Sequence, residues 1–258
     1  MLFSFVIPTY NRSQKVVRSI DSVLKQPDWQ SYAEILVVDD GSTDNTLEIL
    51  EDYIVRYQIK LIKHGENKGV AAAKNTGIQH ASFEYVVLLD SDDLLCENGL
   101  NYLIKKLGEK EIDMYFAGSK LMRNGSLMYN PNFYGFKSYK EMLTQSVGEY
   151  LPICRTKILK ENLLEDLRGF ESITWLKIVK KGHSVFFDDK AIRLYDDIGE
   201  DRLSNRFSGF RNAKKMNAGY NNYLTEFRSD LKKLSYRNYL KIRFKALCYS
   251  ILASSKLV

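Results

Sequence analysis

The feature of this sequence that most constrains its fold is a regular alternation, through about the first 95 residues, of short apolar runs and amphipathic stretches. The apolar runs have the length of buried strands and occupy residues 2–7, 34–39, 59–63 and 85–90. Between them, apolar residues recur at helical spacing, as at Val16, Ile20 and Val23. Strands and helices that alternate in this way are typical of a mostly parallel sheet with helices on both faces. The sequence therefore predicts an α/β fold.

Beyond about residue 95 the pattern is less regular. The expected elements, in chain order, are a helix over 97–107, a strand over 112–117, a loop or small hairpin over 123–139, a mainly helical segment over 157–181, short strands over 184–187 and 191–195, a polar flexible segment over 200–212 and a basic helical tail. This change of pattern divides the chain into three regions, residues 1–95, 96–200 and 201–258.

Polar side chains gather directly after each of the four strands predicted in the first region. The clusters occupy residues 8–11, 39–44, 67–69 and 90–93. In an open parallel sheet, ligands bind beyond the carboxyl ends of the strands, where loops and helix N-termini converge. Taken singly, each cluster could be a turn or a helix cap. Four clusters on one edge of one sheet predict a binding site.

Three aspartates, Asp90, Asp92 and Asp93, indicate the chemistry of this site. Carboxylates packed together repel one another by about 4 kcal/mol at a separation of about 4 Å, so such a cluster is usually held by a cation. The available ligands are oxygens, and no His or Cys stands beside them, which favours Mg²⁺ or Mn²⁺. Such an ion commonly bridges to a diphosphate.

Other nucleotide sites and other metal sites fit this sequence less well. It has no Walker lysine loop, and VIPTYNR (6–12) stands where a dinucleotide-binding glycine fingerprint would follow the first strand. ATP hydrolysis and NAD binding are therefore disfavoured, and a sugar nucleotide remains. His64, His80 and His183 are scattered along the chain, so we expect neither a histidine metal site nor a histidine triad.

Four motifs together resemble those of a known family. They are VIPTYNR (6–12), VVDDGSTDNT (37–46), NKGVAAAKNTG (67–77) and LLDSDD (88–93). In order and spacing the set is similar to the family 2 inverting glycosyltransferases of the GT-A fold, over roughly residues 1–95. The resemblance implies a Rossmann-like GT-A domain in which residues 1–95 bind a nucleotide sugar and residues 96–200 bind the acceptor. A flexible loop and a basic helical tail would follow over residues 201–258.

The resemblance implies nucleotide-binding roles for residues of the first three motifs. These residues are Pro8, Thr9, Tyr10, Asp40, Asn67 and Lys74. Tyr10 would pack on the base, and Asp40 would accept a hydrogen bond from a uracil-type imide nitrogen. Asn67 and Lys74 would lie near the base, ribose and diphosphate, with Lys74 at a position where the family more often has Arg.

The triplet Asp90-Ser91-Asp92 is similar to the DxD motif of the family. The resemblance implies that Asp92 coordinates the metal ion, Mn²⁺ or Mg²⁺. Asp90 would contact the ribose, the metal or a metal-bound water, and Ser91 would belong to the nucleotide site. Further along, the segment LYDDIGEDRLSNR (194–206) offers Asp196, Asp197 and Arg202 as further metal or phosphate ligands, and Arg202 could neutralise the charge of the departing diphosphate. The same segment could equally be a solvated surface loop.

Inverting transfer also needs a general base for the acceptor hydroxyl. The family usually supplies it from an acidic pair at the start of a helix, and RGFESITW (168–175) occupies the matching place. Glu171 is therefore the candidate base, although Ser172 stands where many relatives have Asp. The alternatives are that Glu171 only favours the helix start through its charge, or that Asp166 is the base.

The basic tail carries an amphipathic pattern. Residues 213–258 contain ten Lys or Arg and two Asp or Glu, a balance of +8, so the chain total of +6 leaves −2 for the rest. One helical arc contains Tyr236, Leu240, Phe244, Leu247 and Ile251, flanked by Arg237, Lys241 and Lys245. This pattern suits a helix that lies on an anionic bilayer. The alternatives are packing on the protein body or, less favoured because the body is near neutral, nucleic-acid binding.

The sequence also indicates a compartment. Cys96, Cys154 and Cys248 lie far apart and form no disulfide framework, which favours a reducing cytosol. We expect no secretory signal and no bilayer-spanning run. The prediction is a metal-dependent inverting glycosyltransferase, peripheral on the inner face of the plasma membrane. It would use a UDP-sugar to extend a glycan linked to polyprenyl diphosphate, as in capsule or O-antigen assembly. The alternatives are a non-catalytic sugar-nucleotide-binding scaffold and a sugar nucleotidyltransferase.

Overall fold

The computed structural model describes residues 1–167, 169–197 and 212–254. The chain forms two compact units. We call the first the sheet unit, which comprises Met1–Lys137, Val147–Leu164 and Gly182–Ile198. We call the second the helical unit, which comprises Ser138–Ser146, Glu165–Lys181 and Gly199–Val258. The assignment of nucleotide-sugar binding to residues 1–95 and of acceptor binding to residues 96–200 stays a prediction.

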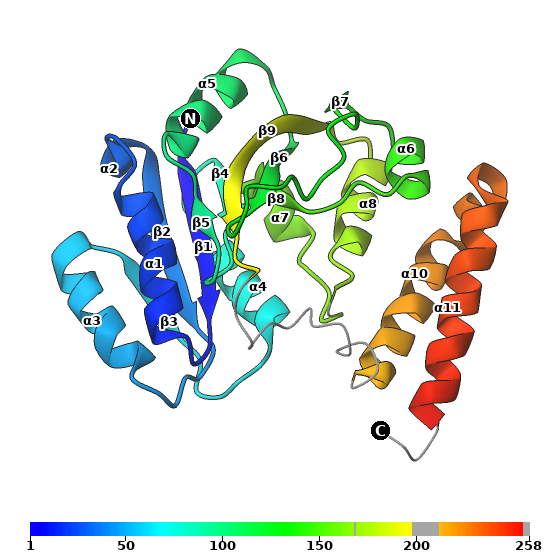
Figure 1. The fold of residues 1–258 in the computed structure, drawn as a ribbon, viewed down its shortest axis with the longest axis horizontal. Helices are drawn as coiled ribbons and strands as arrows, with labels where there is room; N and C mark the ends of the chain where they lie inside the picture. Colours follow the sequence, from blue (N-terminus) through cyan, green and yellow to red (C-terminus); the bar gives the residue numbers. More distant parts are fainter. Residues whose placement is uncertain (168, 198–211, 255–258) are drawn as a thin grey trace. The chain divides into compact units, whose positions relative to one another are not determined.

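The sheet unit is built on one mixed sheet with the strand order β3-β2-β1-β4-β8-β6-β9-β5, and β7 pairs with β9 (Figure 1). The strands are β1 (Phe3–Thr9), β2 (Ala33–Asp39), β3 (Lys60–Lys63), β4 (Tyr85–Leu88), β5 (Leu94–Leu95), β6 (Met114–Leu121), β7 (Gly135–Phe136), β8 (Tyr150–Arg155) and β9 (Val185–Tyr195). The first four strands pair in parallel, and β8 introduces antiparallel pairs between β4 and β6. The α/β prediction is confirmed, with a second half less parallel than the first.

Helices of the sheet unit follow the apolar spacing seen in the sequence. They are α1 (Ser13–Leu24), α2 (Trp29–Tyr32), α3 (Thr46–Tyr57), α4 (Val70–His80), α5 (Gly99–Glu109) and α7 (Thr156–Glu161). Val16, Ile20 and Val23 are fully buried on α1, where they join the core formed by alternate residues of the central strand β1. Burial of this stripe accounts for the helix, because most helical stability in proteins comes from packing of the apolar face.

One expected pair of short strands is a single long strand. β9 runs without a break from Val185 to Tyr195 and includes Asp188, Asp189 and Lys190, which lie between the two strands expected over 184–187 and 191–195. The carboxylate of Asp188 is buried and accepts hydrogen bonds from the hydroxyls of Tyr102 and Tyr115 and from the backbone nitrogen of Lys190. These tertiary contacts satisfy a charged side chain inside the sheet, which the local sequence does not reveal.

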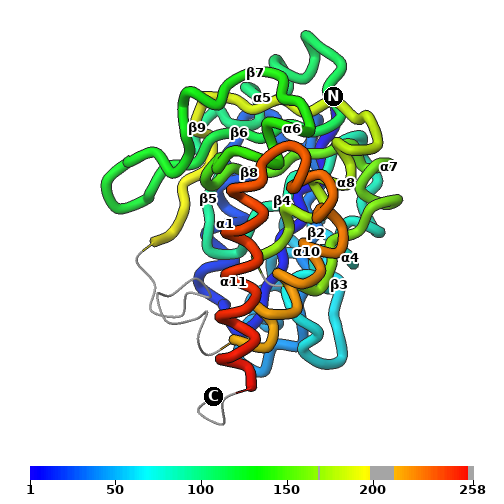
Figure 2. The backbone as a smooth tube through the Cα atoms, turned by 90° about the vertical axis from the view of Figure 1, so that its right-hand side faces the viewer, coloured from blue at the N-terminus to red at the C-terminus, as the bar shows by residue number. Residues whose placement is uncertain are grey.

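The helical unit has its own small core. Its helices are α6 (Tyr139–Thr144), α8 (Ser172–Lys180), α10 (Ala213–Leu234) and α11 (Tyr236–Ser254), and α10 and α11 run side by side (Figures 1 and 2). The core residues are Leu143, Phe170, Ile173, Leu176, Phe227, Leu231 and Tyr239. The expected C-terminal helices are confirmed. No helix in the described residues is long and apolar enough to cross a membrane.

Candidate functional site

The polar clusters that follow β1 and β2 meet through Asn11. β1 pairs in parallel with β2, so the two strands end at the same edge of the sheet. The backbone nitrogen of Asn11 donates to Ser42 Oγ at 2.9 Å, and Asn11 Oδ1 accepts from the backbone nitrogen of Thr43 at 2.8 Å. Asn11 has a φ of 50°, a left-handed conformation that Asn adopts more readily than most residues. The first two predicted clusters are therefore in direct contact.

The second cluster holds the third through Asp40. Its Oδ1 accepts from the backbone nitrogen of Lys68 at 3.0 Å, and its Oδ2 accepts from that of Gly69 at 2.8 Å. Gly41 has a φ of +79°, and a Cβ there would lie 2.7 Å from the carbonyl carbon of Glu66. Glycine is required at this position because the loop before α4 packs directly on its backbone.

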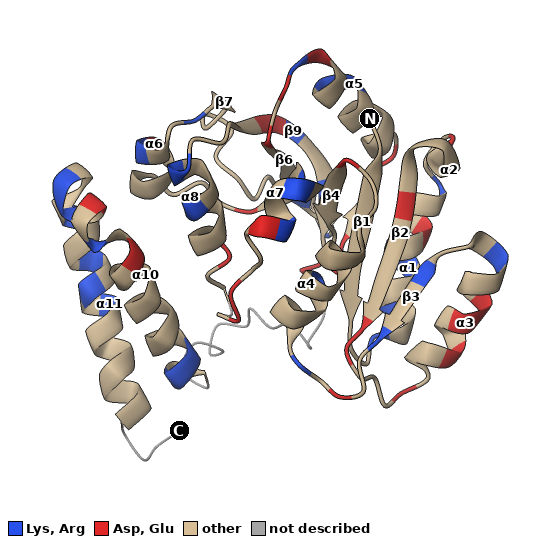
Figure 3. Cartoon of the chain, turned by 180° about the vertical axis from the view of Figure 1, so that it is seen from behind, with Lys and Arg blue, Asp and Glu red and all other residues tan. Residues whose placement is uncertain are grey.

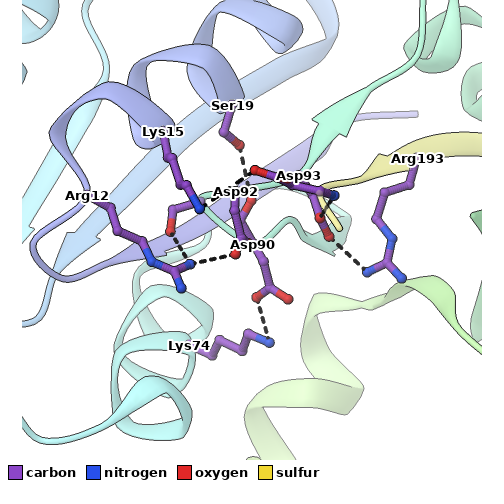
Figure 4. Close-up of polar contacts among 10 residues, drawn as sticks. Arg12, Lys15, Ser19, Lys74, Asp90, Asp92, Asp93 and Arg193 are labelled. Carbon is purple, nitrogen blue, oxygen red and sulfur yellow. Dashed lines mark hydrogen bonds and ion pairs between the residues drawn. The ribbon is translucent and has the colours of Figure 1, made fainter. Parts of the chain in front are cut away.

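The fourth cluster supplies three carboxylates, and each pairs with a basic side chain from another part of the sheet unit (Figure 4). The pairs are Asp90 Oδ1 with Lys74 Nζ at 2.9 Å, Asp92 Oδ2 with Arg12 Nη1 at 2.8 Å, and Asp93 Oδ2 with Arg193 Nη1 at 3.3 Å. The sequence predicts a bound cation at this cluster. The protein itself places three cationic side chains there, from the loop after β1, from α4 and from β9.

The three carboxylates differ in how readily they ionise. Burial disfavours the charge of Asp90, but the charge and hydrogen bond of Lys74, with the charge of Arg193, hold its pKa below the usual value. Burial and the charge of Asp90 raise the pKa of Asp92. Burial raises the pKa of Asp93 to about 7, although Arg193 opposes the shift. An added cation would therefore favour the ionised forms of Asp92 and Asp93.

The remaining predicted nucleotide residues lie at the same edge. Pro8 and Thr9 end β1, and Tyr10 directly after them is 42% exposed. Asn67 is exposed in the loop before α4, beside Asp40's partners. Ser91 is buried, and its Oγ lies 3.5 Å from Nη1 of Arg12. The structure brings these residues together around one edge, and their individual roles stay predictions.

Residues predicted from the second half of the chain are placed differently. Glu171 belongs to the helical unit, where it directly precedes α8 without making a side-chain cap to the helix. Asp166 is exposed in the same unit. Asp196 is buried in the sheet unit, its backbone nitrogen donating to Asp93 Oδ1 at 3.1 Å. Arg202 lies outside the described residues.

Three residues of this site were not found from the sequence. Arg12 stands in the first motif but had been given no role, and Arg193 is a buried charge within a strand. His64 contacts Asp40 and Thr76, although the histidines had been regarded as scattered. For Arg193, the sequence did offer a signal. An arginine inside the apolar run 191–195 is expected to be buried and paired, because buried charges in proteins are almost always paired.

Comparison with known proteins points to one family. The model of glycosyl transferase family 2 matches residues 4–167. The chain is 42% identical over 114 residues to glycosyltransferase GlyG of Streptococcus pneumoniae serotype 4, which covers 44% of this chain and 37% of GlyG. It is 37% identical over 130 residues to an Escherichia coli protein, UDP-Glc:alpha-D-GlcNAc-diphosphoundecaprenol beta-1,3-glucosyltransferase WfgD, which covers 49% of each. The chain spans about half or less of the length of these two relatives.

A solved structure shows the same fold. The crystal structure of S. aureus TarS 1–349 in complex with UDP-GlcNAc is similar to this chain with a TM-score of 0.69 and 24% sequence identity. The similarity covers 88% of this chain and 67% of the TarS chain. It confirms the GT-A type of α/β fold that the four motifs had implied.

Proposed function

This chain belongs to glycosyl transferase family 2, and from that premise we propose that it is an inverting glycosyltransferase with a UDP-sugar as donor. The observation that carries the proposal is the edge formed by β1, β2 and β4, where Asp90 and Asp92 face Lys74 and Arg12. Basic side chains suit the phosphates of the donor, and carboxylates suit the cation that accompanies them. Residues 1–95 are the donor half in this proposal, and residues 96–200 are the acceptor half.

Each donor contact follows from the position of a side chain at this edge. Tyr10 is exposed there and can pack on the base, while Asp40 can accept from an imide nitrogen. Lys74 and Arg12 already lie within 3 Å of carboxylate oxygens, so phosphate oxygens of the donor can take over part of these contacts. The site thus exchanges internal ion pairs for contacts with the diphosphate.

A divalent cation, Mn²⁺ or Mg²⁺, fits beside Asp90 and Asp92. In the described residues no group of three His, Cys, Asp or Glu side chains could hold a metal ion by itself, so further ligands would come from the diphosphate and water. The raised pKa of Asp92 supports this fit, because a cation would stabilise its charge. When bound, the ion would neutralise negative charge on the departing diphosphate.

Glu171 is the proposed general base. Its carboxylate would take the proton of the acceptor hydroxyl as that oxygen bonds to the anomeric carbon and the bond from this carbon to the diphosphate oxygen breaks. A single displacement of this kind converts an α-linked donor into a β-linked product. The position of Glu171 directly before α8 supports the assignment, because the resemblance implies a base at the start of a helix in this part of the chain.

We also propose a lipid-linked glycan as acceptor and an anionic membrane surface, at the cytoplasmic face of the plasma membrane, as the place of action. The E. coli relative acts on a diphosphoundecaprenol-linked substrate, as its name states. The apolar arc predicted on the tail is exposed on α11: Tyr236, Leu240, Phe244, Leu247 and Ile251 are 49% to 67% exposed. Lys and Arg residues lie along the same helix, which contains no Asp or Glu (Figure 3).

The test is turnover of UDP-sugars in the presence of Mn²⁺ and a polyprenyl-diphosphate-linked glycan. We expect release of UDP and a product whose new linkage has the opposite anomeric configuration to the donor. Asp92→Asn should abolish transfer, whereas Asp52→Asn, at an exposed position on α3, should leave it intact. Absence of transfer with every donor would favour a sugar-nucleotide-binding scaffold, and release of pyrophosphate would favour a nucleotidyltransferase.

A further inference from the structure

We call the edge of the sheet formed by the carboxyl ends of β1, β2 and β4 the donor edge. His64 is a buried side chain at this edge, and the proposed mechanism gives it no role. It directly follows β3, and its Nδ1 lies 2.6 Å from Oδ1 of Asp40. On the other side of the ring, Nε2 lies 2.9 Å from Oγ1 of Thr76, which belongs to α4. The side chains of His64 and Asp40 are only 8% and 4% exposed. His64 therefore connects the base-reading carboxylate to the helix that carries Lys74.

The direction of the hydrogen bond between His64 and Asp40 follows from the chemistry of the partners. An ionised carboxylate only accepts, so Nδ1 of His64 donates to Asp40. Nε2 on the other side of the ring forms a hydrogen bond with the hydroxyl of Thr76, which can act as donor or as acceptor. Thr76 thereby fixes the ring orientation that presents the N–H group to Asp40.

These contacts use most of the acceptor capacity of Asp40. A carboxylate has about four acceptor positions, two on each oxygen. Oδ1 receives His64 Nδ1 and the backbone nitrogen of Lys68, while Oδ2 receives the backbone nitrogen of Gly69. Among the described residues these are the contacts of this carboxylate, which leaves about one acceptor position, on Oδ2.

A second polar group, on a residue beside Asp40, lacks a hydrogen-bond partner among the described residues. Thr9 Oγ1 is buried and has no hydrogen-bond partner among the described residues. Thr9 is joined to Asp40 because its carbonyl accepts the backbone N–H of Asp40 at 2.8 Å. A hydroxyl can donate to the carbonyl that flanks an imide N–H on a base. The unpaired hydroxyl and the remaining acceptor position therefore belong to two residues that lie side by side where the paired strands β1 and β2 end.

We propose that His64 restricts Asp40 to a single hydrogen-bond donor on the base and thereby selects uracil over guanine. This inference rests on the proposed function, in which Asp40 reads the base. The imide edge of uracil presents one N–H, whereas guanine presents N1–H and the N2 amino group side by side. With Oδ1 occupied by His64 and Lys68, guanine would leave one buried donor unpaired or would displace His64. Leaving a buried polar group unpaired costs roughly 10- to 100-fold in affinity.

The experiment is calorimetric binding of UDP, GDP and CDP, with Mn²⁺, to the full chain and to three variants. For the unaltered chain we expect UDP to bind at least about 10-fold more tightly than GDP. His64→Ala frees an acceptor position on Oδ1, so the preference for UDP over GDP should fall by about 10-fold. The preference over CDP should not change, because the N3 lone pair of cytosine still faces the carboxylate.

Two further variants distinguish a role of His64 in base selection from a role in fold stability alone. His64→Asn keeps an N–H donor near the position of Nδ1 and should retain most of the preference for UDP. Thr76→Val keeps the ring but removes the hydroxyl that orients it, so the preference should fall by a smaller factor, about 3-fold. Thr76→Val carries the test if His64→Ala does not fold, as judged by thermal unfolding.

The outcomes separate this inference from the proposed function. Equal weakening of UDP and GDP in His64→Ala, or an unchanged ratio in Thr76→Val, would overturn the role of His64 and leave the donor site intact. Equal or tighter binding of GDP by the unaltered chain would also overturn it. If no nucleoside diphosphate binds the folded chain, the proposed function fails and this inference fails with it.

Discussion

The donor edge of the sheet unit and the exposed side of α11 use basic residues in opposite ways. At the donor edge the basic side chains are largely buried and face carboxylates, with Arg193 5% exposed and Lys74 11% exposed. On α11, Arg237, Lys241 and Lys245 are exposed on a helix without acidic residues. A buried charge needs a specific partner, whereas an exposed one does not. Donor-edge variants should therefore act singly and strongly, and α11 variants weakly and additively.

Among the variants that compare the two units, Glu171→Gln is expected to have the largest effect on turnover. Loss of a general base should lower turnover by about 10²- to 10⁴-fold. Binding of UDP should stay unchanged, since the donor contacts lie in the sheet unit. Steady-state kinetics and calorimetry check the two halves of this prediction. Asp166→Asn is the control and should retain activity; near-normal turnover in Glu171→Gln would remove Glu171 from the mechanism.

A large loss of stability is expected from Arg193→Met at the donor edge. This change leaves the buried carboxylate of Asp93 without its partner, which typically costs about 3–5 kcal/mol. Thermal unfolding at pH 8, above the pKa of about 7 for Asp93, should show a midpoint lower by roughly 10 °C.

The matched control for Arg193→Met is Arg56→Met. Arg56 pairs with Asp52 on the surface, where both side chains are more than 60% exposed, so its loss should cost less than about 1 kcal/mol. Equal effects of the two variants would contradict the contrast between paired buried charges and exposed ones.

A smaller effect is expected on membrane binding when α11 is changed. Lys241→Gln and Lys245→Gln should each weaken binding to anionic vesicles by about 1 kcal/mol, or roughly 5-fold, and the two losses should add. Phe244→Ser should weaken binding further, because its exposed ring would no longer enter the interface. Vesicle sedimentation measures all three variants. Lys214→Gln on α10 is the control, and equal binding to neutral and anionic vesicles would contradict the electrostatic part.

The smallest effect is expected from Glu34→Gln, at the other end of β2 from the donor edge. Glu34 accepts from Ser4 Oγ and Lys60 Nζ, each at 2.6 Å, and burial opposes its charge. These hydrogen bonds nevertheless hold its pKa below the usual value. The stability that they contribute is present above the pKa of the unfolded chain, near 4.5, and is lost as the pH falls through the lower folded-state pKa.

Glu34→Gln should therefore lower stability at pH 7 by about 1 kcal/mol and flatten the acid part of the stability curve. Urea unfolding at several pH values measures both effects. UDP binding should remain unchanged in Glu34→Gln. Glu34 and Asp92 thus contrast within one sheet, because only the change at Asp92 should affect UDP binding. A loss of UDP binding would show that the two ends of the strands are not independent.

The sequence predicted the first half of the sheet well because three of its four strands, β1, β2 and β4, are buried on both faces. Such strands read as continuous apolar runs, and β1, β2, β3 and β4 lie within two residues of their expected positions. The turn residues at their carboxyl ends are local features as well. The Asp90–Asp92 cluster could therefore be located before its surroundings were known.

The partners of these residues could not be predicted, because tertiary packing decides them. Lys74 reaches Asp90 because α4 packs closely on β1, where a Cβ at Gly77 would lie 2.3 Å from Val6. Arg193 reaches Asp93 only through the register of β9, 100 residues further along the chain. His64 reaches Asp40 because β3 lies beside β2. None of these three contacts produces a periodic pattern in the sequence.

The edge with Asp90 and Asp92 is proposed to bind a nucleoside diphosphate together with a divalent cation. The most direct test of this proposal is calorimetric titration of UDP into the full chain, with and without Mn²⁺, repeated on Asp92→Asn. We expect UDP binding that depends on Mn²⁺ and is lost in Asp92→Asn while the variant remains folded. Mn²⁺-dependent binding that survives in Asp92→Asn, or no binding of UDP to the folded chain, would contradict the account.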